Sequence, residues 1–385
     1  MTYPSAFAQP PHVAAGLPPA APPHADLVVP RRPGTHLPAW VGLAVLGALA
    51  LGLVAYFVTF LGPAASVVGA VLAIFPLIAV LAAIRLIDRW EPEPRSLMLF
   101  ALAWGAVGSV VLTLGVDLVL SLTFGTLPDA ASAVVQAPVV EEIAKGIGVF
   151  LLFALARRSF DGPVDGVVYG ALVGAGFAFT ENILYFADSL ISGGIGGTLV
   201  TFVLRGILSP FAHVMFTAVI GYMLGLAARR GRRPGESLGY AAVGLLGAIV
   251  LHALWNGSAV FADFFSLYAL LQVPLFGMYI VGIVLLRREE ARLTRLRLGE
   301  YAAAGWFSAP EVEMLATSRG RSEAIAWARR LPGDRSALMR EFIAEATALA
   351  AARQRVVSGR APLAVDEERV YLARTMAVRQ RLVAP

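Results

Sequence analysis

Residues 39–61 read AWVGLAVLGALALGLVAYFVTFL, 23 consecutive positions without a charged side chain. A helix of this length measures about 35 Å, enough to cross the ~30 Å hydrocarbon core of a bilayer. The whole chain agrees, because 58% of its 385 residues are hydrophobic and only 15% are charged. Soluble domains are usually about half apolar and about a quarter charged. This stretch therefore predicts a helical membrane protein.

Seven further apolar segments follow, so the sequence predicts an all-α membrane bundle of about eight transmembrane helices. Their ranges are 64–87, 97–122, 132–156, 165–187, 198–227, 237–258 and 264–286. The sixth of the eight spans contains Pro210, which lacks the N–H of a regular helical hydrogen bond. We expect a half-helix from Thr198 to Ser209, followed by a kinked span that starts near Phe211.

Arginines occupy every second loop of this arrangement. They are Arg31 and Arg32, Arg89 and Arg95, Arg157 and Arg158, Arg229, Arg230, Arg232 and Arg233, and Arg287 and Arg288. The alternate loops, around residues 62, 127, 192 and 262, contain no Lys or Arg. Positive loops face the cytoplasm, so the sequence predicts a multi-pass protein of the cell membrane with both termini cytoplasmic. The net charge of +5 fits this orientation better than a nucleic-acid partner.

The two ends of the chain differ from the apolar region. Residues 1–38 hold ten of the 24 prolines, and we expect them to form a disordered cytoplasmic tail. Residues 39–286 would form the eight-helix transmembrane domain. Residues 287–385 are rich in Arg, Glu, Ala and Leu and predict a helical cytoplasmic region, with Gly333 and Gly359 as breakers. Within it, Pro310–Leu315 and Ser336–Ala352 have the pattern of amphipathic helices.

Ionisable and amide side chains interrupt spans four to seven. They include Glu141, Glu142, Lys145, Glu181, Asn182, Arg205, His213, His252 and Asn256. A charge at the bilayer centre costs at least a few kcal/mol, so each of these residues is a functional candidate. Lys145 is the only lysine of the chain.

Depth estimates bring these side chains together. Glu141 lies about 15 Å below the outer end of its span, and Glu181 and His252 lie about 22–24 Å from the cytoplasmic ends of theirs. All three fall between the midplane and the outer leaflet. The fifth span also carries glycines at a spacing that permits close helix approach. These are Gly166, Gly170 and Gly174. The sequence therefore predicts a polar pocket inside a helix bundle.

Three carboxylates, two histidines and an asparagine are suited to activating a water molecule. A carboxylate in a low dielectric can act as a general base, and a histidine can orient water or protonate a leaving amine. A second histidine and an amide can stabilise an oxyanion. Hydrolysis of a peptide bond fits this set, and no redox cofactor motif, phosphate loop or serine elbow competes with it. The chain has no cysteine, which excludes a thiolate nucleophile or metal ligand.

Four motifs on successive spans resemble those of the PrsW family of intramembrane proteases. They are Glu141-Glu142-x-x-Lys145, Gly176-Phe177-Ala178-Phe179-Thr180-Glu181-Asn182-x-x-Tyr185, Phe211-x-His213 and His252-x-x-Trp255-Asn256. The loop Asp88-Arg89-Trp90-Glu91-Pro92-Glu93-Pro94 is also similar to a loop of that family. The resemblance covers about residues 64–286. It implies a superfamily shared with the CAAX prenyl endopeptidases and Abi-type membrane proteases.

The resemblance implies a role for each catalytic candidate. Glu141 would be the general base, and Glu142 would tune or position it. His213 would help to activate water, and His252 with Asn256 would form the oxyanion site. The remaining residues would support the site. These are Lys145, which matches the basic position of the family, and Glu181, Asn182 and Arg205.

The resemblance also implies a membrane-anchored protein substrate inside the lipid bilayer. The family includes proteases that cut membrane-anchored anti-sigma factors on the extracytoplasmic side, in agreement with the outer-leaflet pocket. We expect no nucleic-acid partner and no metal cofactor. The oligomeric state stays open.

Other interpretations of the polar set remain. A zinc-dependent metalloprotease could use Glu141 or Glu181 together with His213 and His252 as ligands, although no H-E-x-x-H helix is present. A proton-coupled transporter could use the same groups as a relay, although no internal repeat is visible. The Glu141, Glu142 and Lys145 group could also be a structural salt bridge.

Overall fold

The computed structural model describes residues 37–157, 159–261, 264–358 and 364–384. In this described part of the chain, helices are the only regular secondary structure, which confirms the predicted all-α membrane protein. The chain divides into two compact units, a membrane unit of Thr35–Ile283 and a second unit formed mainly by Val284–Pro385. The predicted disordered tail lies outside the described residues, except that residues 37 and 38 begin the first helix.

The membrane unit contains the following helices in chain order. They are α1 (Leu37–Leu61), α2 (Pro63–Ile87), α3 (Arg95–Ala103), α4 (Val110–Phe124), α5 (Asp129–Ala131), α6 (Ala137–Leu155), α7 (Pro163–Phe202), α8 (Ala212–Arg229), α9 (Leu238–Phe261), α10 (Phe264–Leu267) and the first part of α11 (Val273–Ala303). Four π-helical segments lie between them, namely η1 (Trp104–Ser109), η2 (Ser132–Gln136), η3 (Val203–Leu208) and η5 (Tyr268–Gln272), and η4 (Pro234–Ser237) is a 3₁₀ turn.

Six stretches of the described residues are long and apolar enough to cross a membrane. They are Ala44–Leu61, Pro63–Ile87, Arg95–Phe124, Pro163–Arg229, Pro234–Val260 and Phe264–Ala303. The fourth stretch holds two of the eight predicted spans. The predicted fourth span corresponds to α6, which is outside the six and carries three charged residues. These two differences account for the gap between six stretches and eight predicted spans.

The chain reverses direction inside α7. Gly194 has φ +58° there, a left-handed conformation that glycine adopts without steric cost. The segments on either side of it meet again, because Arg205 Nε donates to Asn182 Oδ1 at 2.8 Å. A break then follows η3, and α8 begins at Ala212. This break agrees with the expected half-helix that ends at Ser209.

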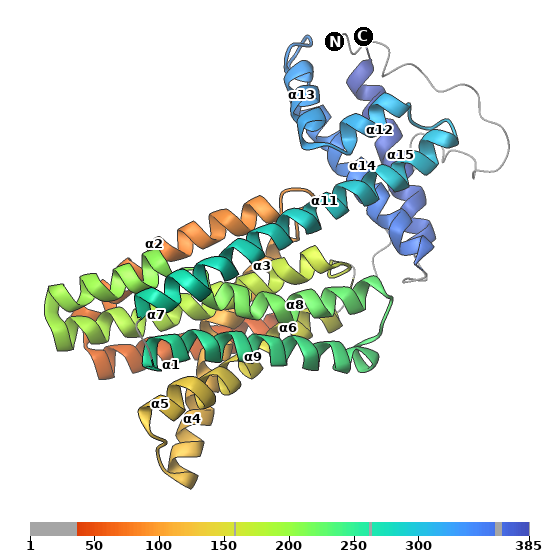
Figure 1. Cartoon of the computed structure of the whole chain (residues 1–385). Helices are drawn as coiled ribbons and strands as arrows, with labels where there is room; N and C mark the ends of the chain where they lie inside the picture. Colours follow the sequence, from red (N-terminus) through yellow and green to blue (C-terminus); the bar gives the residue numbers. More distant parts are fainter. Residues whose placement is uncertain (1–36, 158, 262–263, 359–363, 385) are drawn as a thin grey trace. The chain divides into compact units, whose positions relative to one another are not determined.

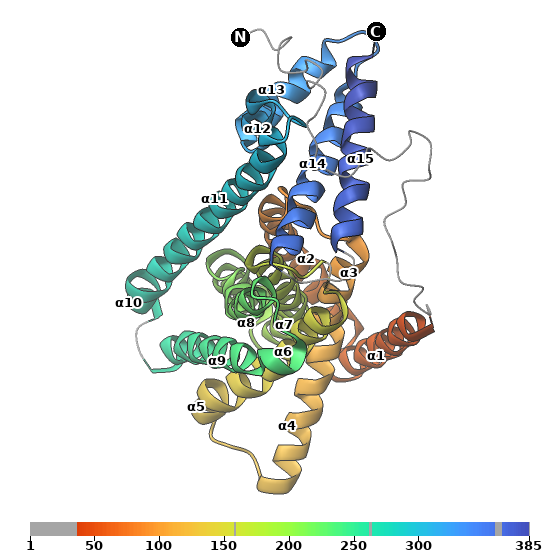
Figure 2. The same cartoon turned by 90° about the vertical axis from the view of Figure 1, so that its right-hand side faces the viewer.

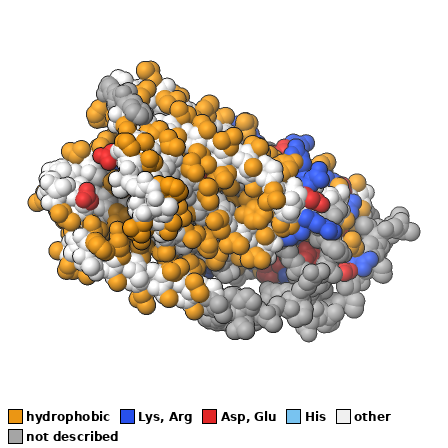
Figure 3. Space-filling model, turned by 90° about the horizontal axis from the view of Figure 1, so that it is seen from below, with side chains coloured by type: hydrophobic (Ala, Val, Ile, Leu, Met, Phe, Trp, Pro, Cys, Tyr) orange, Lys and Arg blue, Asp and Glu red, His pale blue; other side chains and the backbone are white. Residues whose placement is uncertain are grey.

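Close contact between α7 and α8 forms the centre of the membrane unit. α7 also packs against α2, and α8 packs against α9 (Figures 1 and 2). A Cβ atom at Gly166 would stand 2.0 Å from the carbonyl oxygen of Gly221, so the two backbones touch. α4 and α5 leave the bundle together (Figures 1 and 2). Hydrophobic side chains cover most of the face that Figure 3 shows, as lipid contact requires.

The loop between α2 and α3 holds a buried carboxyl group. Glu93 is 8% exposed and accepts a hydrogen bond from the Tyr169 hydroxyl at 2.5 Å. Its backbone N–H donates to Asp88 Oδ1 at 3.0 Å. Burial, together with the nearby Asp165 carboxyl, raises the pKa of Glu93 well above its usual value of 4.5. The folded loop therefore favours the protonated form of Glu93 more than an exposed position would.

Replacement of Glu93 by glutamine should flatten the dependence of stability on pH. A raised folded pKa stabilises the protein fully below 4.5, and this contribution is lost as pH rises through the folded pKa. The loss amounts to about 1.4 kcal/mol for each unit of the pKa shift. Thermal unfolding in detergent, followed from pH 4.5 upward, should show a smaller fall of Tm for Glu93→Gln than for the wild type. Parallel curves would contradict the assignment to Glu93.

The second unit is a helical assembly with its own hydrophobic core. It contains the end of α11 and the helices α12 (Ala309–Leu315), α13 (Ser318–Arg329), α14 (Ser336–Val357) and α15 (Ala364–Val383). Its core includes Leu298, Leu315, Met339 and Phe342, each fully buried. The two amphipathic helices expected from the sequence correspond to α12 and α14. Gly333, at φ +76°, lies in the turn between α13 and α14, and Gly359 lies outside the described residues.

Candidate active site

The membrane unit joins eight of the nine predicted site residues in one continuous network of contacts. α6 supplies Glu141, Glu142 and Lys145, α7 supplies Glu181 and Asn182, η3 supplies Arg205, α8 supplies His213, and α9 supplies His252. The ninth residue, Asn256, lies one turn beyond His252 on α9. Residues that are up to 111 positions apart in sequence therefore meet within the bundle.

Lys145 lies at the centre of this network. Its Nζ is 2.6 Å from Glu142 Oε1, 3.4 Å from Glu141 Oε2 and 3.2 Å from His213 Nδ1. It also lies 4.2 Å from the centroid of the Phe177 ring. The side chain is fully buried. A buried cation is tolerated only when it is paired, and here two carboxylates provide that pairing.

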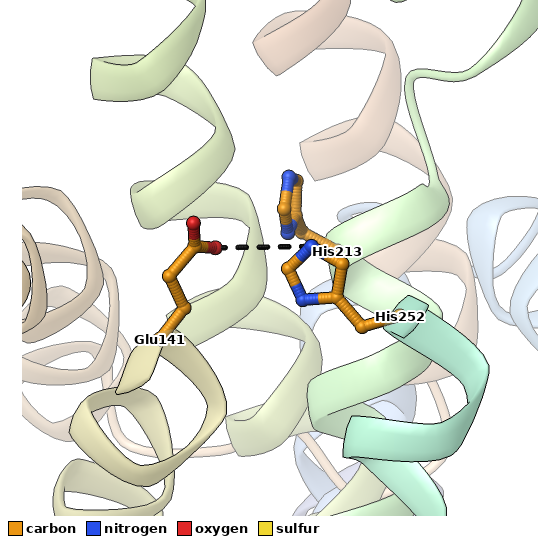
Figure 4. Close-up of side chains that lie close together, drawn as sticks. All are labelled: Glu141, His213 and His252. Atoms are coloured by element: carbon orange, nitrogen blue, oxygen red, sulfur yellow. Dashed lines mark ion pairs between the residues drawn. The ribbon is translucent and has the colours of Figure 1, made fainter. Parts of the chain in front are cut away.

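The two adjacent glutamates have different surroundings. Glu142 has a fully buried side chain and, besides Lys145, contacts the Thr217 hydroxyl at 3.1 Å and His252 Nδ1 at 3.0 Å. The Glu141 side chain keeps 10% exposure. Its Oε2 lies 3.9 Å from His252 Nε2 (Figure 4). Glu141 is therefore the less enclosed carboxylate of the pair.

The two histidines also differ in what they can do. The Glu142 carboxylate beside Nδ1 of His252 favours a proton on that nitrogen, and Nε2 then carries a lone pair on the Glu141 side. Both ring nitrogens of His213 are engaged, since Nδ1 faces Lys145 and Nε2 lies 2.7 Å from Glu181 Oε2. His252 is thus the histidine suited to sharing a water molecule with Glu141.

Glu181 links His213 to a second cation. Arg205 forms an ion pair with Glu181, and its guanidinium stacks 3.9 Å above the Tyr185 ring. Asn182 accepts from Arg205 Nε, as described above. Arg205 and Glu181 keep 24% and 15% side-chain exposure, so this end of the network is less buried than Lys145.

Two amide side chains hold the segment that precedes α6. Asn256 donates from Nδ2 to the carbonyl oxygen of Ala133 at 2.8 Å. Gln136 donates from Nε2 to Asp117 Oδ1 at 2.8 Å. η2 accepts the first bond and donates the second, so the two bonds connect α9 and α4 to the start of the helix that carries Glu141. One of the two amide hydrogens of Asn256 is used in this bond.

Thr217 is a site residue that the sequence did not predict. It lies one turn after His213 on α8 and is fully buried. Its hydroxyl donates to Glu142 Oε2, while Lys145 and His252 contact the other oxygen of that carboxylate. Threonine is common in transmembrane helices, and no spacing rule distinguishes this one from a packing residue.

Loss of the Thr217 hydroxyl should lower activity through Glu142. A hydrogen bond to a charged group contributes about 1.5–3 kcal/mol, so we expect Thr217→Val to reduce kcat/KM for a cleaved reporter by roughly tenfold or more. Thr217→Ser keeps the hydroxyl and should retain most of the activity. Equal rates for the valine and serine variants would show that the hydroxyl does not position Glu142.

Glu141, His213 and His252 each place a potential ligand atom within 4.8 Å of the other two (Figure 4). Zinc accepts such a set when the nitrogen lone pairs are free and no other cation competes. Here the Lys145 ammonium contacts both Glu141 and His213, and Glu181 holds the remaining nitrogen of His213. Only His252 offers an unengaged nitrogen. This arrangement of donors does not fit a bound zinc ion. Glu181, which the sequence offered as an alternative zinc ligand to Glu141, does not belong to this group of three.

Comparisons with known proteins give the family to which the chain is similar. The family described as PrsW family intramembrane metalloprotease matches residues 93–285, about half of the chain, and this range includes all nine site residues. Protease PrsW of Geobacillus kaustophilus is 33% identical over 152 residues, which cover 40% of this chain and 63% of that protein. Protease PrsW of Oceanobacillus iheyensis is 29% identical over 218 residues, 56% of this chain and 94% of that protein. No solved structure matches the chain.

Proposed function

The chain belongs to the PrsW family, and on this basis we propose that it is an intramembrane endopeptidase that cleaves a membrane-anchored protein. The observation that carries the proposal is the contrast between the two adjacent glutamates. Glu142 is fully buried and held by Lys145, Thr217 and His252, whereas the Glu141 side chain keeps 10% exposure and lies beside Nε2 of His252. A partly accessible carboxylate on a rigid charged network is suited to general-base catalysis.

In the proposed mechanism, Glu141 and His252 share the attacking water. Glu141 accepts a proton as the water oxygen bonds to the carbonyl carbon of the scissile peptide, and the carbonyl electron pair moves to oxygen. When the tetrahedral intermediate collapses, the C–N bond breaks and Glu141 returns the proton to the leaving amine. The reaction is balanced without any redox partner. Glu142 fixes the ring of His252 through Nδ1.

The remaining residues would position these groups or stabilise charge. Asn256 keeps one amide hydrogen beyond its bond to Ala133, and we propose that it donates to the oxyanion. His213 would act through Lys145 instead of contacting the water, because both of its nitrogens are engaged. Glu181, Asn182 and Arg205 would hold His213 in place.

The orientation of the chain leads to the proposed substrate. With both termini in the cytoplasm, the site would lie toward the outer leaflet, and a single-span protein cut near its extracytoplasmic side is the expected substrate. A regulator of the anti-sigma-factor type has that form. Kinship with the CAAX prenyl endopeptidases and Abi-type proteases is part of the same proposal.

Two other functions predict different measurements. A zinc protease would require the ligand set to be released from Lys145 and Glu181. A proton-coupled transporter would use the buried Glu, His and Lys groups as a relay, and would move protons or solutes instead of cleaving peptides.

The proposal is tested with the full chain in liposomes and a panel of single-span fluorogenic reporters. We expect cleavage by the wild type that persists in a zinc chelator and disappears in Glu141→Gln. Cleavage that is lost in the chelator and restored by zinc would indicate a metalloprotease. Proton or solute flux without cleavage of any reporter would contradict the protease function.

A further inference from the structure

The donors that suggest a metal site surround a side chain that already carries a positive charge. Glu141, His213 and His252 form the group whose ligand atoms lie within 4.8 Å of one another. The Lys145 Nζ contacts two of these three residues, at 3.4 Å and 3.2 Å. It belongs to the same helix as Glu141, one turn further along.

We propose that the Lys145 ammonium is the built-in cation of this site and that it prevents a divalent metal ion from binding. This inference deepens the proposed function and rests on it, because it concerns the same site. It also departs from the metalloprotease description of the matching family. Lysine is a compact point charge with three donor hydrogens. Those hydrogens match three acceptors here, namely Glu141, Glu142 and Nδ1 of His213.

Charge and geometry both oppose a second cation in this place. The carboxylate oxygen of Glu141 and the lone pair of His213 are directed to Nζ, so a metal ion would have to displace these contacts. The ion would also stand next to an ammonium group in a medium of low dielectric, where like charges repel strongly. Lys145 is tightly confined, with a fully buried side chain and the Phe177 ring on its flank.

Removal of the ammonium should convert the same residues into a real metal site. Lys145→Met leaves Glu142 without its cation, and a buried uncompensated carboxylate favours uptake of another positive charge. Glu141, His213 and His252 would then supply a carboxylate and two imidazoles, a set of protein ligands found in zinc sites. Lys145→Arg retains a cation and should therefore bind as little zinc as the wild type.

The test measures bound metal in the purified full chain. Each protein is incubated with zinc chloride in detergent, freed of unbound ion, and analysed for zinc by elemental mass spectrometry. We expect little zinc in the wild type and Lys145→Arg, and about one ion per chain in Lys145→Met, a rise of roughly tenfold or more. The double variant Lys145→Met with His252→Ala should lose the ion, which would place it at the predicted ligands.

Two outcomes would overturn the inference. One is a wild type that retains about one zinc ion per chain and loses it in His252→Ala. The other is a folded Lys145→Met, and a folded Lys145→Gln, that bind no zinc. Size-exclusion profiles and circular dichroism establish whether each variant is folded. If neither Lys145→Met nor Lys145→Gln folds, the zinc content of the wild type and of His252→Ala still decides the question. Because the readout is bound metal, absence of peptide cleavage would contradict the proposed function and leave this result standing.

Discussion

Glu141→Gln is expected to lower the rate of peptide cleavage by about a thousandfold, in the range that loss of a general base usually causes. The amide has nearly the same shape as the carboxylate but cannot accept the proton of the attacking water. Stability should change little, because Glu141 makes one 3.4 Å contact with Lys145 while Glu142 makes the 2.6 Å contact. The measurement is single-turnover cleavage of a reporter in liposomes, with Tm recorded for each variant.

The matched control for this experiment is a glutamate outside the site. Glu323 lies on α13 of the second unit, where its side chain is 42% exposed and pairs with Arg319. Glu323→Gln makes the same chemical change and should cleave at the wild-type rate. A Glu141→Gln variant that retains activity within tenfold would exclude Glu141 as the base.

The sequence predicted which polar residues come together in the membrane unit because burial of charge in a membrane is costly. The nine candidate residues of spans four to seven stood out against an apolar background, and eight of them lie in one network. The depth estimate was sufficient to place Glu141, Glu181 and His252 at a common level. The lengths of the apolar runs supplied the spans and the arginine pattern supplied the expected orientation, and the described residues confirm an all-α membrane bundle.

The division of roles within the site could not be predicted from the sequence. Glu141 and Glu142 are adjacent, and adjacent residues of a helix point about 100° apart. Which of them faces the interior depends on the rotation of α6 against α8 and α9, which no local pattern records. For the same reason, the sequence could not predict that the Thr217 hydroxyl contacts Glu142. It also could not predict that Lys145 lies between two glutamates and His213.

The sequence predicted a loop around residue 192, but it could not predict that the chain reverses at Gly194 within a few residues. The predicted loop around residue 192 has no proline and no charged side chain between positions 189 and 204, so hydropathy alone gives only its approximate place. The structure shows a turn built on one left-handed glycine. That sharp turn returns Arg205 to Glu181 and Asn182, and therefore fixes the support of His213.

Glycines of α7 set the position of α8, and Gly174 lies against the backbone of His213 itself. A Cβ atom at Gly174 would stand 2.4 Å from the carbonyl oxygen of His213 and 2.9 Å from Cα of Val214, both backbone atoms that cannot rotate away. Gly174→Ala should therefore push α8 outward. A shift of about 1 Å in a catalytic group can lower the rate about a hundredfold, and we expect a loss of that order in reporter cleavage.

The control for Gly174→Ala is a glycine of α4. Apart from the backbone of its own helix, no atom lies within 4 Å of a Cβ built at Gly115, so Gly115→Ala makes the same substitution without a steric conflict. Its activity and Tm should equal those of the wild type. Overpacking costs about 1–3 kcal/mol, so the Tm of Gly174→Ala should fall as well. If Gly174→Ala cleaves as fast as Gly115→Ala, the close approach of α7 to α8 does not position His213. The glycines of α7 would then contribute to helix packing alone. The position of the His213 ring would be set by its contacts with Glu181 and Lys145, and not by the backbone of α8.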